Sequence, residues 1–197
     1  MTTDDAILVR LCLSGDAEAI GQLVGRYNGD VYGLCVRLLH HRQDAEDVAQ
    51  EVFLRVFRSL GGWDPSRPLR PWIMGITVNR CRTWIAQRKR RPELVDYLQD
   101  VVAGAAPDDS AELLVEIHAA LAELRLDYRT VFLLFHEQGQ PYEEIALTLG
   151  RPVGTIKTWL HRARLEILDR LRRRGMVSEE EAPPSPLTRQ KNRDESP

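Results

Sequence analysis

Residues 142–164 read YEEIALTLGRPVGTIKTWLHRAR and predict two helices joined by a tight turn. The first helix covers residues 142–149, the turn follows at 150–153, and the second helix runs from Gly154 or Thr155 to about Arg173. Two helices joined by a short glycine-containing turn are typical of the helix-turn-helix, whose second helix lies in the major groove of DNA. The C-terminal part of the chain is therefore predicted to be a helical DNA-binding unit.

The second of these helices has two chemically different sides. At 100° per residue its apolar stripe consists of Ile156, Leu160, Ala163 and Ile167. Its polar side carries the candidate DNA contacts Thr155, Lys157, Thr158, His161, Arg162 and Arg164. Residues 151–174 hold eight basic residues against two acidic ones, which supplies charge for phosphates and donors for base edges. A solvated basic face is the alternative, and the preceding helix and turn favour DNA recognition.

Helical spacing of apolar residues also fills the first ninety residues. Gly15 is expected to end a first helix, and Asp16 to cap the next, because its carboxylate accepts from free backbone N–H groups. Residues 63–71 contain three prolines and are expected to form a loop. A helix from about Trp72 to Arg88 follows this loop. The chain is therefore predicted to be all-α, with two small helical domains.

Three carboxylates share one face of a helix that is expected to begin near Asp44 and to stop at Gly61. Asp44, Asp47 and Glu51 lie at i, i+3 and i+7, opposite an apolar stripe. No second cluster converges with them at the spacing of a metal site. We interpret this face as solvated or as a docking surface for a basic partner.

A basic cluster with aromatic neighbours follows the proline-rich loop. Residues 80–91 hold six basic residues and no acidic one, and Trp72 and Trp84 lie close to them in sequence. Cations that follow a phosphate backbone, together with aromatic rings that stack on bases, suit single-stranded nucleic acid. The alternative is a core tryptophan in a helix whose outer face is basic.

The charge reverses after this cluster. Residues 93–127 contain nine acidic residues against a single Arg125, and small residues and a proline interrupt their middle. We therefore expect a first domain at 1–92, an acidic linker at 93–110 and a second domain at 111–175. Residues 176–197 are rich in proline and charge and are expected to be a disordered tail.

The remaining sequence features exclude several classes of protein. Cys12, Cys35 and Cys81 are widely spaced, which predicts neither a disulfide framework nor a zinc site. The chain opens with two acids where a secretory signal would be basic, and its longest apolar run is too short for a membrane span, so a cytoplasmic location is expected. No phosphate-binding glycine loop, GxSxG elbow or HExxH motif is present. We predict no enzymatic activity, no catalytic residue, no metal and no cofactor.

Two further motifs resemble one known family. Residues 44–53, DAEDVAQEVF, with Pro71-Trp72-Ile73 and Asn79, resemble region 2 of bacterial sigma-70 factors. Residues 142–146 and 152–164 resemble region 4 of the same family. Their order, and the absence of a sizeable domain between them, resemble the extracytoplasmic-function (ECF) group.

This resemblance implies a transcription initiation factor that binds core RNA polymerase and promoter DNA. Asp44, Asp47, Gln50 and Glu51 would contact the clamp helices of the polymerase β′ subunit, and the β flap would be a second polymerase contact. The minus-10 element would be read and opened by Trp72, Asn79, Arg80, Arg82 and Arg88. The polar side of the helix after residue 154 would read the minus-35 element. An anti-sigma factor is a further partner that the family implies.

Three other functions remain open from the residues. A one-component regulator would explain the helix-turn-helix but not the acidic helix. A small metal-dependent enzyme could use His40, His41, Asp44 and Asp47. An adaptor would dock on polymerase without opening promoters.

Overall fold

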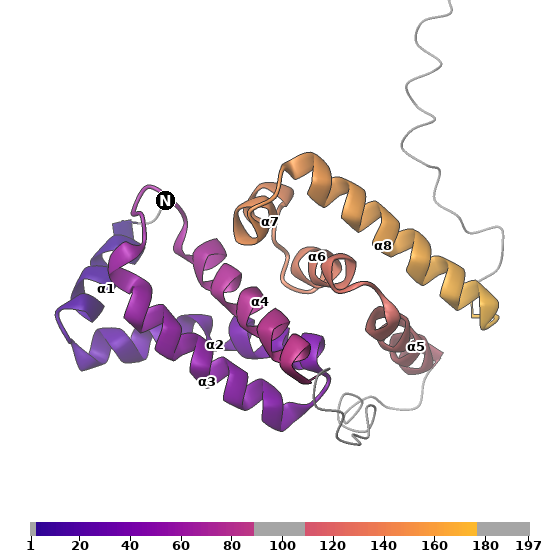
Figure 1. Ribbon diagram of the computed structural model, residues 1–197, viewed down its shortest axis with the longest axis horizontal. Coiled ribbons are helices and arrows are strands. Elements are labelled where there is room, and N and C mark those ends of the chain that lie inside the picture. The colour runs from indigo at the N-terminus through magenta and orange to yellow at the C-terminus, as the bar shows by residue number, and fades with distance from the viewer. Residues whose placement is uncertain (1–2, 89–108, 177–197) are drawn as a thin grey trace, which may run out of the picture.

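The computed structural model describes residues 3–88 and 109–176, which form an all-helical protein (Figure 1). Its elements are α1 (Thr3–Leu13), α2 (Ala17–Leu39), α3 (Arg42–Ser59), the short 3-10 helix η1 (Leu60–Gly62), α4 (Leu69–Arg88), α5 (Asp109–Glu123), α6 (Leu126–His136), α7 (Tyr142–Leu149) and α8 (Val153–Arg173). The predicted all-α class is confirmed. The predicted linker at 93–110 lies outside the described residues except for Asp109 and Ser110, which begin α5, and the predicted tail does so except for Met176.

The ends of the first helices follow from local capping. Gly15 adopts a positive φ of 83°, and the Asp16 carboxylate accepts from the backbone N–H groups of Glu18 and Ala19 at 2.9 and 3.0 Å, as predicted. Helix α3 begins at Arg42, two residues earlier than expected. His41 is its N-cap, because its Nδ1 accepts from the backbone N–H of Asp44 at 3.3 Å.

Helix α4 also begins earlier than predicted, at Leu69 rather than near Trp72. Pro71 is compatible with this start because the N–H groups of the first helical turn have no partner within the helix. The expectation of a loop through residue 71 was therefore wrong for its last three residues. The earlier start lets Leu69, which is fully buried, anchor the N-terminal end of α4 in the core.

The N-terminal half is a bundle in which α2, α3 and α4 pack against one another and α1 packs on α2. Its interior is aliphatic and includes Leu23, Val31, Leu34 and Leu38 from α2, Val48, Val52 and Val56 from α3, and Ile73 and Met74 from α4. The three cysteines are buried and free, and the sulfur atoms of Cys35 and Cys81 lie 3.7 Å apart between α2 and α4. This bundle fixes how α3 and α4 lie beside each other.

The C-terminal half contains the expected helix-turn-helix. Helix α7 ends at Gly150, which adopts the left-handed conformation at φ 59°, and α8 begins at Val153, slightly before the predicted start. The predicted apolar stripe is buried against α5, α6 and α7 through Ile156, Leu160, Ala163 and Ile167. The polar side of α8 consequently faces outward.

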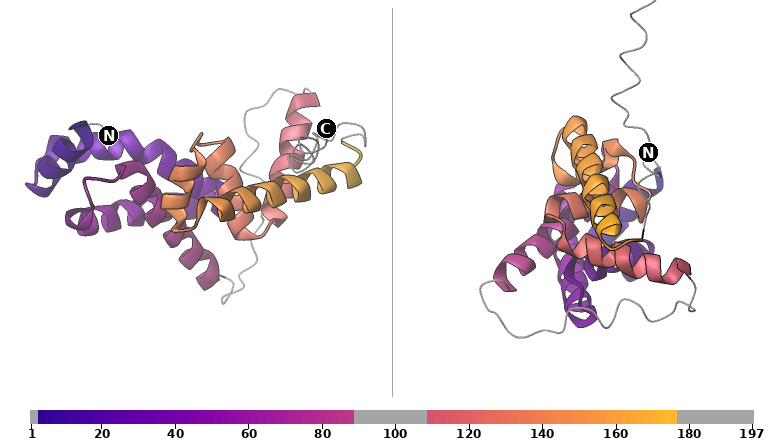
Figure 2. Two further views of the ribbon diagram at one scale, coloured as in Figure 1. Left: turned by 90° about the horizontal axis from the view of Figure 1, so that it is seen from above. Right: turned by 90° about the vertical axis from the view of Figure 1, so that its right-hand side faces the viewer.

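The two halves contact each other directly. Helix α4 packs on α7, and α2 packs on α6, so that α4 lies in the middle of an elongated arrangement (Figures 1 and 2). The approach is closest at Gly75 of α4, where a Cβ atom would lie 3.0 Å from the backbone oxygen of Thr148. A larger side chain at position 75 would therefore meet the backbone of the other half.

Candidate functional site

The four residues predicted to contact polymerase fall into two groups on α3. Asp47 and Gln50 are exposed, and Asp47 takes part in no ion pair within residues 3–88 and 109–176. Asp44 and Glu51 instead pair with arginines of α4. Two of the four residues are therefore exposed to a partner, and the other two form ion pairs with α4.

The Glu51–Arg80 pair is bidentate and partly buried. Arg80 donates from Nε and Nη2 to the two carboxylate oxygens of Glu51 at 2.5 and 3.0 Å, and the Arg80 side chain is only 9% exposed. The hydrogen bonds from Arg80 lower the pKa of Glu51, against a smaller opposing effect of burial. Charge-assisted bidentate pairs hold both partners in a defined geometry. Arg80, a predicted minus-10 contact, is thus held against α3.

Arg88 also pairs with a carboxylate of α3, near the start of that helix. Its guanidinium pairs with Asp44 and also lies over the Trp84 ring, 4.7 Å from the ring centroid. Asp44 is contacted by His41 Nδ1 at 3.1 Å as well. Two of the predicted DNA cations therefore neutralise two of the predicted polymerase carboxylates.

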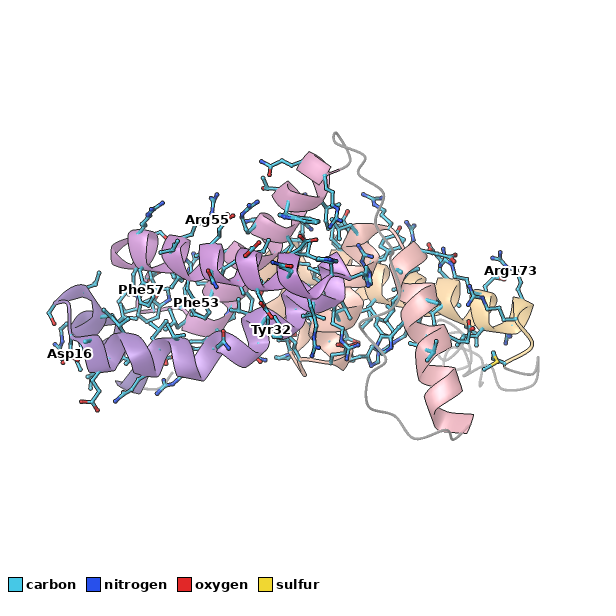
Figure 3. The ribbon with its side chains drawn as sticks, turned by 90° about the horizontal axis from the view of Figure 1, so that it is seen from below. Asp16, Tyr32, Phe53, Arg55, Phe57 and Arg173 are labelled. Atoms are coloured by element: carbon cyan, nitrogen blue, oxygen red, sulfur yellow. The ribbon has the colours of Figure 1, made fainter. Side chains whose placement is uncertain are left out.

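A groove of about 680 Å³ runs between α2 and α3, and the exposed Gln50 is part of its lining. Its lining is mainly apolar and consists of Val24, Asn28 and Tyr32 from α2 and Glu46, Ala49, Gln50, Phe53, Leu54 and Phe57 from α3. Figure 3 shows Phe53 and Phe57 between these two helices, with Arg55 on the other side of α3. The groove offers an apolar surface beside polar groups that can orient a protein partner.

A second groove, of about 700 Å³, runs along the surface between α3 and α4. It is lined by Glu51, Leu54, Arg55, Arg58 and Ser59 from α3 and by Ile76, Asn79, Arg80 and Thr83 from α4. Asn79 is exposed, so this predicted DNA contact is accessible from the groove. Arg82 and Trp72 are not in the lining: Arg82 pairs with Asp127 of α6 at 2.8 Å, and Trp72 packs partly buried against the core.

Arg55 and Arg58 are the cations that the sequence analysis missed. Both side chains are exposed, and neither is in an ion pair within the described part of the chain. Their spacing of three residues on a predicted helix was a usable signal.

On α8 the predicted minus-35 residues mostly face outward. Lys157, Thr158, Arg162 and Arg164 are exposed, and Thr155 and His161 are half-buried. Two of the cations are held in place: Arg162 donates to the Tyr128 hydroxyl at 3.1 Å, and Arg164 lies over the Phe135 ring beside His136. Lys157 lies 5.5 Å from the Tyr142 ring centroid. Helix α8 thus presents exposed hydrogen-bond donors, and contacts with α6 hold two of them, Arg162 and Arg164.

The helices of residues 3–88 and 109–176 include none with the length and apolar character required to cross a membrane. Within the same residues, His, Cys, Asp and Glu side chains form no group of three or more that could hold a metal ion. The histidines considered for a metal-dependent enzyme have other contacts here, since His40 meets Arg129 and His41 caps α3.

Comparison with known proteins places both halves in one family. The family described as Sigma-70 region 2 matches residues 23–91, and the family described as Sigma-70, region 4 matches residues 114–167. The chain is 31% identical to RNA polymerase sigma-H factor of Pseudomonas aeruginosa, over 84% of this chain and 92% of that protein. It is 34% identical to the ECF RNA polymerase sigma factor SigW of Bacillus subtilis, over 80% and 91%. The structure of CnrH, solved with the cytosolic domain of CnrY, superposes with a TM-score of 0.66 at 26% identity, covering 85% and 96%.

Proposed function

The chain belongs to the ECF group of the sigma-70 family of RNA polymerase sigma factors, and from this membership we propose that it guides core polymerase to particular promoters and opens them. One observation carries the proposal: each of the two matched regions presents its own exposed surface. One surface comprises both grooves along α3, and the other is the outer side of α8. The predicted DNA opening and element recognition rest on these surfaces.

The polymerase contact is proposed for the α2–α3 side of the bundle. Asp47 and Gln50 are exposed on α3, and the groove that Gln50 helps to line also contains Phe53 and Phe57. Apolar side chains in such a groove supply buried area, and the polar rim supplies orientation. Asp44 and Glu51 would contribute less directly, because their carboxylates are already paired with α4.

The minus-10 strand is proposed to lie in the α3–α4 groove. Asn79 and Thr83 can meet base edges, and Arg55 and Arg58 can meet phosphates. Leu54 and Ile76 provide apolar surface for the faces of unstacked bases. Holding bases out of the duplex costs a few kcal/mol per step, which contacts of this kind must offset. Arg80 then acts as a positioning residue that Glu51 holds at the groove.

The minus-35 element is proposed to bind the outer side of α8. Lys157 and Arg162 are exposed cations there, and Thr158 is an exposed hydroxyl between them in sequence. A recognition helix reads base edges in the major groove with residues near its N-terminal end. This is the part of α8 in which Thr155, Lys157 and Thr158 lie.

Promoter opening is the direct test. The purified chain is mixed with core RNA polymerase and a candidate promoter, such as the one upstream of its own gene, and unpaired thymines are mapped with permanganate. Reactive thymines near minus 10 that appear only with both proteins would support the proposal. Protection of duplex DNA by the chain alone, with no opening in the presence of polymerase, would contradict it and favour a one-component regulator.

A further inference from the structure

Arginines along α8 are held by two different kinds of acceptor. Toward the C-terminal end of the helix and at its C-cap, three arginines pair with carboxylates: Arg170 with Glu123, Arg173 with Asp169, and Arg174 with Glu116. Nearer the N-terminal end, Arg162 and Arg164 take part in no ion pair within residues 3–88 and 109–176. Both donate instead to ring residues of α6, the helix that packs beside α8 (Figure 1).

Tyr128 of α6 is the acceptor for Arg162. Its hydroxyl accepts from Nη1 of Arg162 at 3.1 Å, and a tyrosine hydroxyl carries no charge at neutral pH. The Tyr128 side chain is buried, and its ring centroid lies 6.5 Å from that of Trp159 on α8. Packing therefore fixes the position of this hydroxyl, while Arg162 itself is exposed.

His136, at the end of α6, is the acceptor for Arg164. Its Nε2 atom lies 3.2 Å from Nε and 3.1 Å from Nη2 of Arg164. Burial, and then the charge of Arg164, lower the pKa of His136, so the ring is neutral at pH 7 and can accept. The ring centroids of Phe132 and Phe135 lie 4.5 and 5.0 Å from that of His136. Aromatic contacts thus hold the imidazole in place, and Phe135 also lies beneath the Arg164 guanidinium.

The charge of the acceptor decides what a held arginine can still do. A carboxylate offsets the charge that a guanidinium offers to a phosphate, whereas a hydroxyl or a neutral imidazole occupies a donor and leaves the charge in place. An arginine that is already ordered also loses less side-chain entropy when DNA binds. We propose that Tyr128 and His136 are positioning residues for DNA binding, which hold Arg162 and Arg164 for phosphates beside the minus-35 element. This inference rests on the proposed function and adds to it two residues outside the recognition helix.

A double-mutant cycle between Tyr128 and Arg162 tests the first contact. The full chain is bound to core polymerase, and its affinity for a duplex of the promoter upstream of its own gene is measured over a series of salt concentrations. Arg162→Ala should reduce the slope of log affinity against log salt by about 0.9, the contribution of one phosphate contact in B-DNA. Tyr128→Phe keeps the ring and the charge of Arg162, so we expect about threefold weaker binding and an unchanged slope. In the Arg162→Ala background, Tyr128→Phe should have no further effect, because the contact it removes is already absent.

His136 allows the charge of the acceptor to be changed at a single position. His136→Gln keeps an uncharged acceptor, whereas His136→Glu has nearly the same size and supplies a carboxylate. We expect the Gln variant to bind within about twofold of the unsubstituted chain, and the Glu variant to lower the salt slope by about as much as Arg164→Ala does. Because His136 is exposed, this pair of variants decides the question even if Tyr128→Phe unfolds the chain.

Tyr142→Phe and Arg173→Ala are matched controls in the same half of the protein. The Tyr142 ring also contacts α8, through Lys157, but its hydroxyl makes no hydrogen bond within residues 3–88 and 109–176. Arg173 is an exposed arginine of α8 that pairs with the carboxylate of Asp169. Both substitutions should leave the affinity and the salt slope unchanged.

Three results would overturn the inference. They are equal effects of Tyr128→Phe with and without Arg162, equal salt slopes of the Gln and Glu variants at position 136, and an unchanged slope for Arg162→Ala and Arg164→Ala. In each case, promoter opening by the unsubstituted chain with core polymerase would still support the proposed function. Failure of the unsubstituted chain to open promoters would instead contradict the proposed function itself.

Discussion

His40 has two structural roles, one at the end of its own helix and one in a contact with a helix far away in sequence. It ends α2 in the left-handed conformation, with φ 55°, and its ring contacts Arg129 of α6. Burial is the main cause that lowers the pKa of His40 to about 4 from 6.5, and the nearby charges of Arg129, His118 and Arg37 lower it further. The ring is therefore neutral in the folded protein at pH 7 and through the mildly acidic range.

Replacement of His40 should change how stability depends on pH. Between pH 6.5 and about 4 the unfolded chain binds a proton that the folded chain does not, so stability falls as the pH is lowered. The loss is on the order of 3 kcal/mol across that window. His40→Asn tolerates the left-handed backbone and does not titrate. Urea unfolding at pH 7 and pH 4.5 should show a smaller acid-induced loss for the variant, and equal losses would contradict the assignment.

Substitution of Arg55 or Arg58 should weaken the salt dependence of DNA binding. Each phosphate contact to a single strand contributes about 0.7 to the slope of log affinity against log salt. We expect Arg55→Ala and Arg58→Ala each to reduce that slope by about this amount, measured with the polymerase-bound chain and a pre-melted minus-10 oligonucleotide. Arg42→Ala is the control, since Arg42 is an exposed arginine at the opposite end of α3. A slope equal to that of the control would show that the groove does not hold the strand.

The bounds of the helices could largely be predicted from the sequence, but the pairs of residues that join one helix to another could not. Asp16 is a strong capping residue and marked the start of α2 correctly, whereas His41 is a weak one and the start of α3 was placed too late. Apolar periodicity identified the buried side of α8. The pairing of Glu51 with Arg80 was out of reach, because residues 29 positions apart in sequence meet only once α3 and α4 are packed.

The two groups of carboxylates on α3 should respond differently to substitution. Asp47→Lys changes an exposed charge that has no ion-pair partner within residues 3–88 and 109–176, so we expect at least about tenfold weaker binding to core polymerase and a change in unfolding free energy under about 0.5 kcal/mol. Glu18→Lys makes the same charge change on an exposed site of α2 and should leave polymerase affinity unchanged. Binding can be measured by titration of labelled chain with core enzyme. Equal affinities for the two variants would remove Asp47 from the docking surface.

The arrangement of the halves could not be inferred from local patterns. The sequence separates two helical domains at a change of charge, and that pattern carries no information on whether the domains touch. Contacts such as Arg37 with Glu137 join residues a hundred positions apart and depend on complementary surfaces. Charge patterning is informative about solvation and partners, and much less so about such an internal interface.

Leu54 is more than half exposed and is the one residue that lines both grooves of α3. Every other lining residue belongs to one side alone, facing either the α2–α3 groove or the α3–α4 groove. Substitutions on these two sides can therefore accumulate independently. Under the proposed function, a lineage can change the promoters it recognises through the α3–α4 side while the α2–α3 side stays compatible with core polymerase. A substitution at Leu54 alters both grooves at once, so both proposed partners constrain this position.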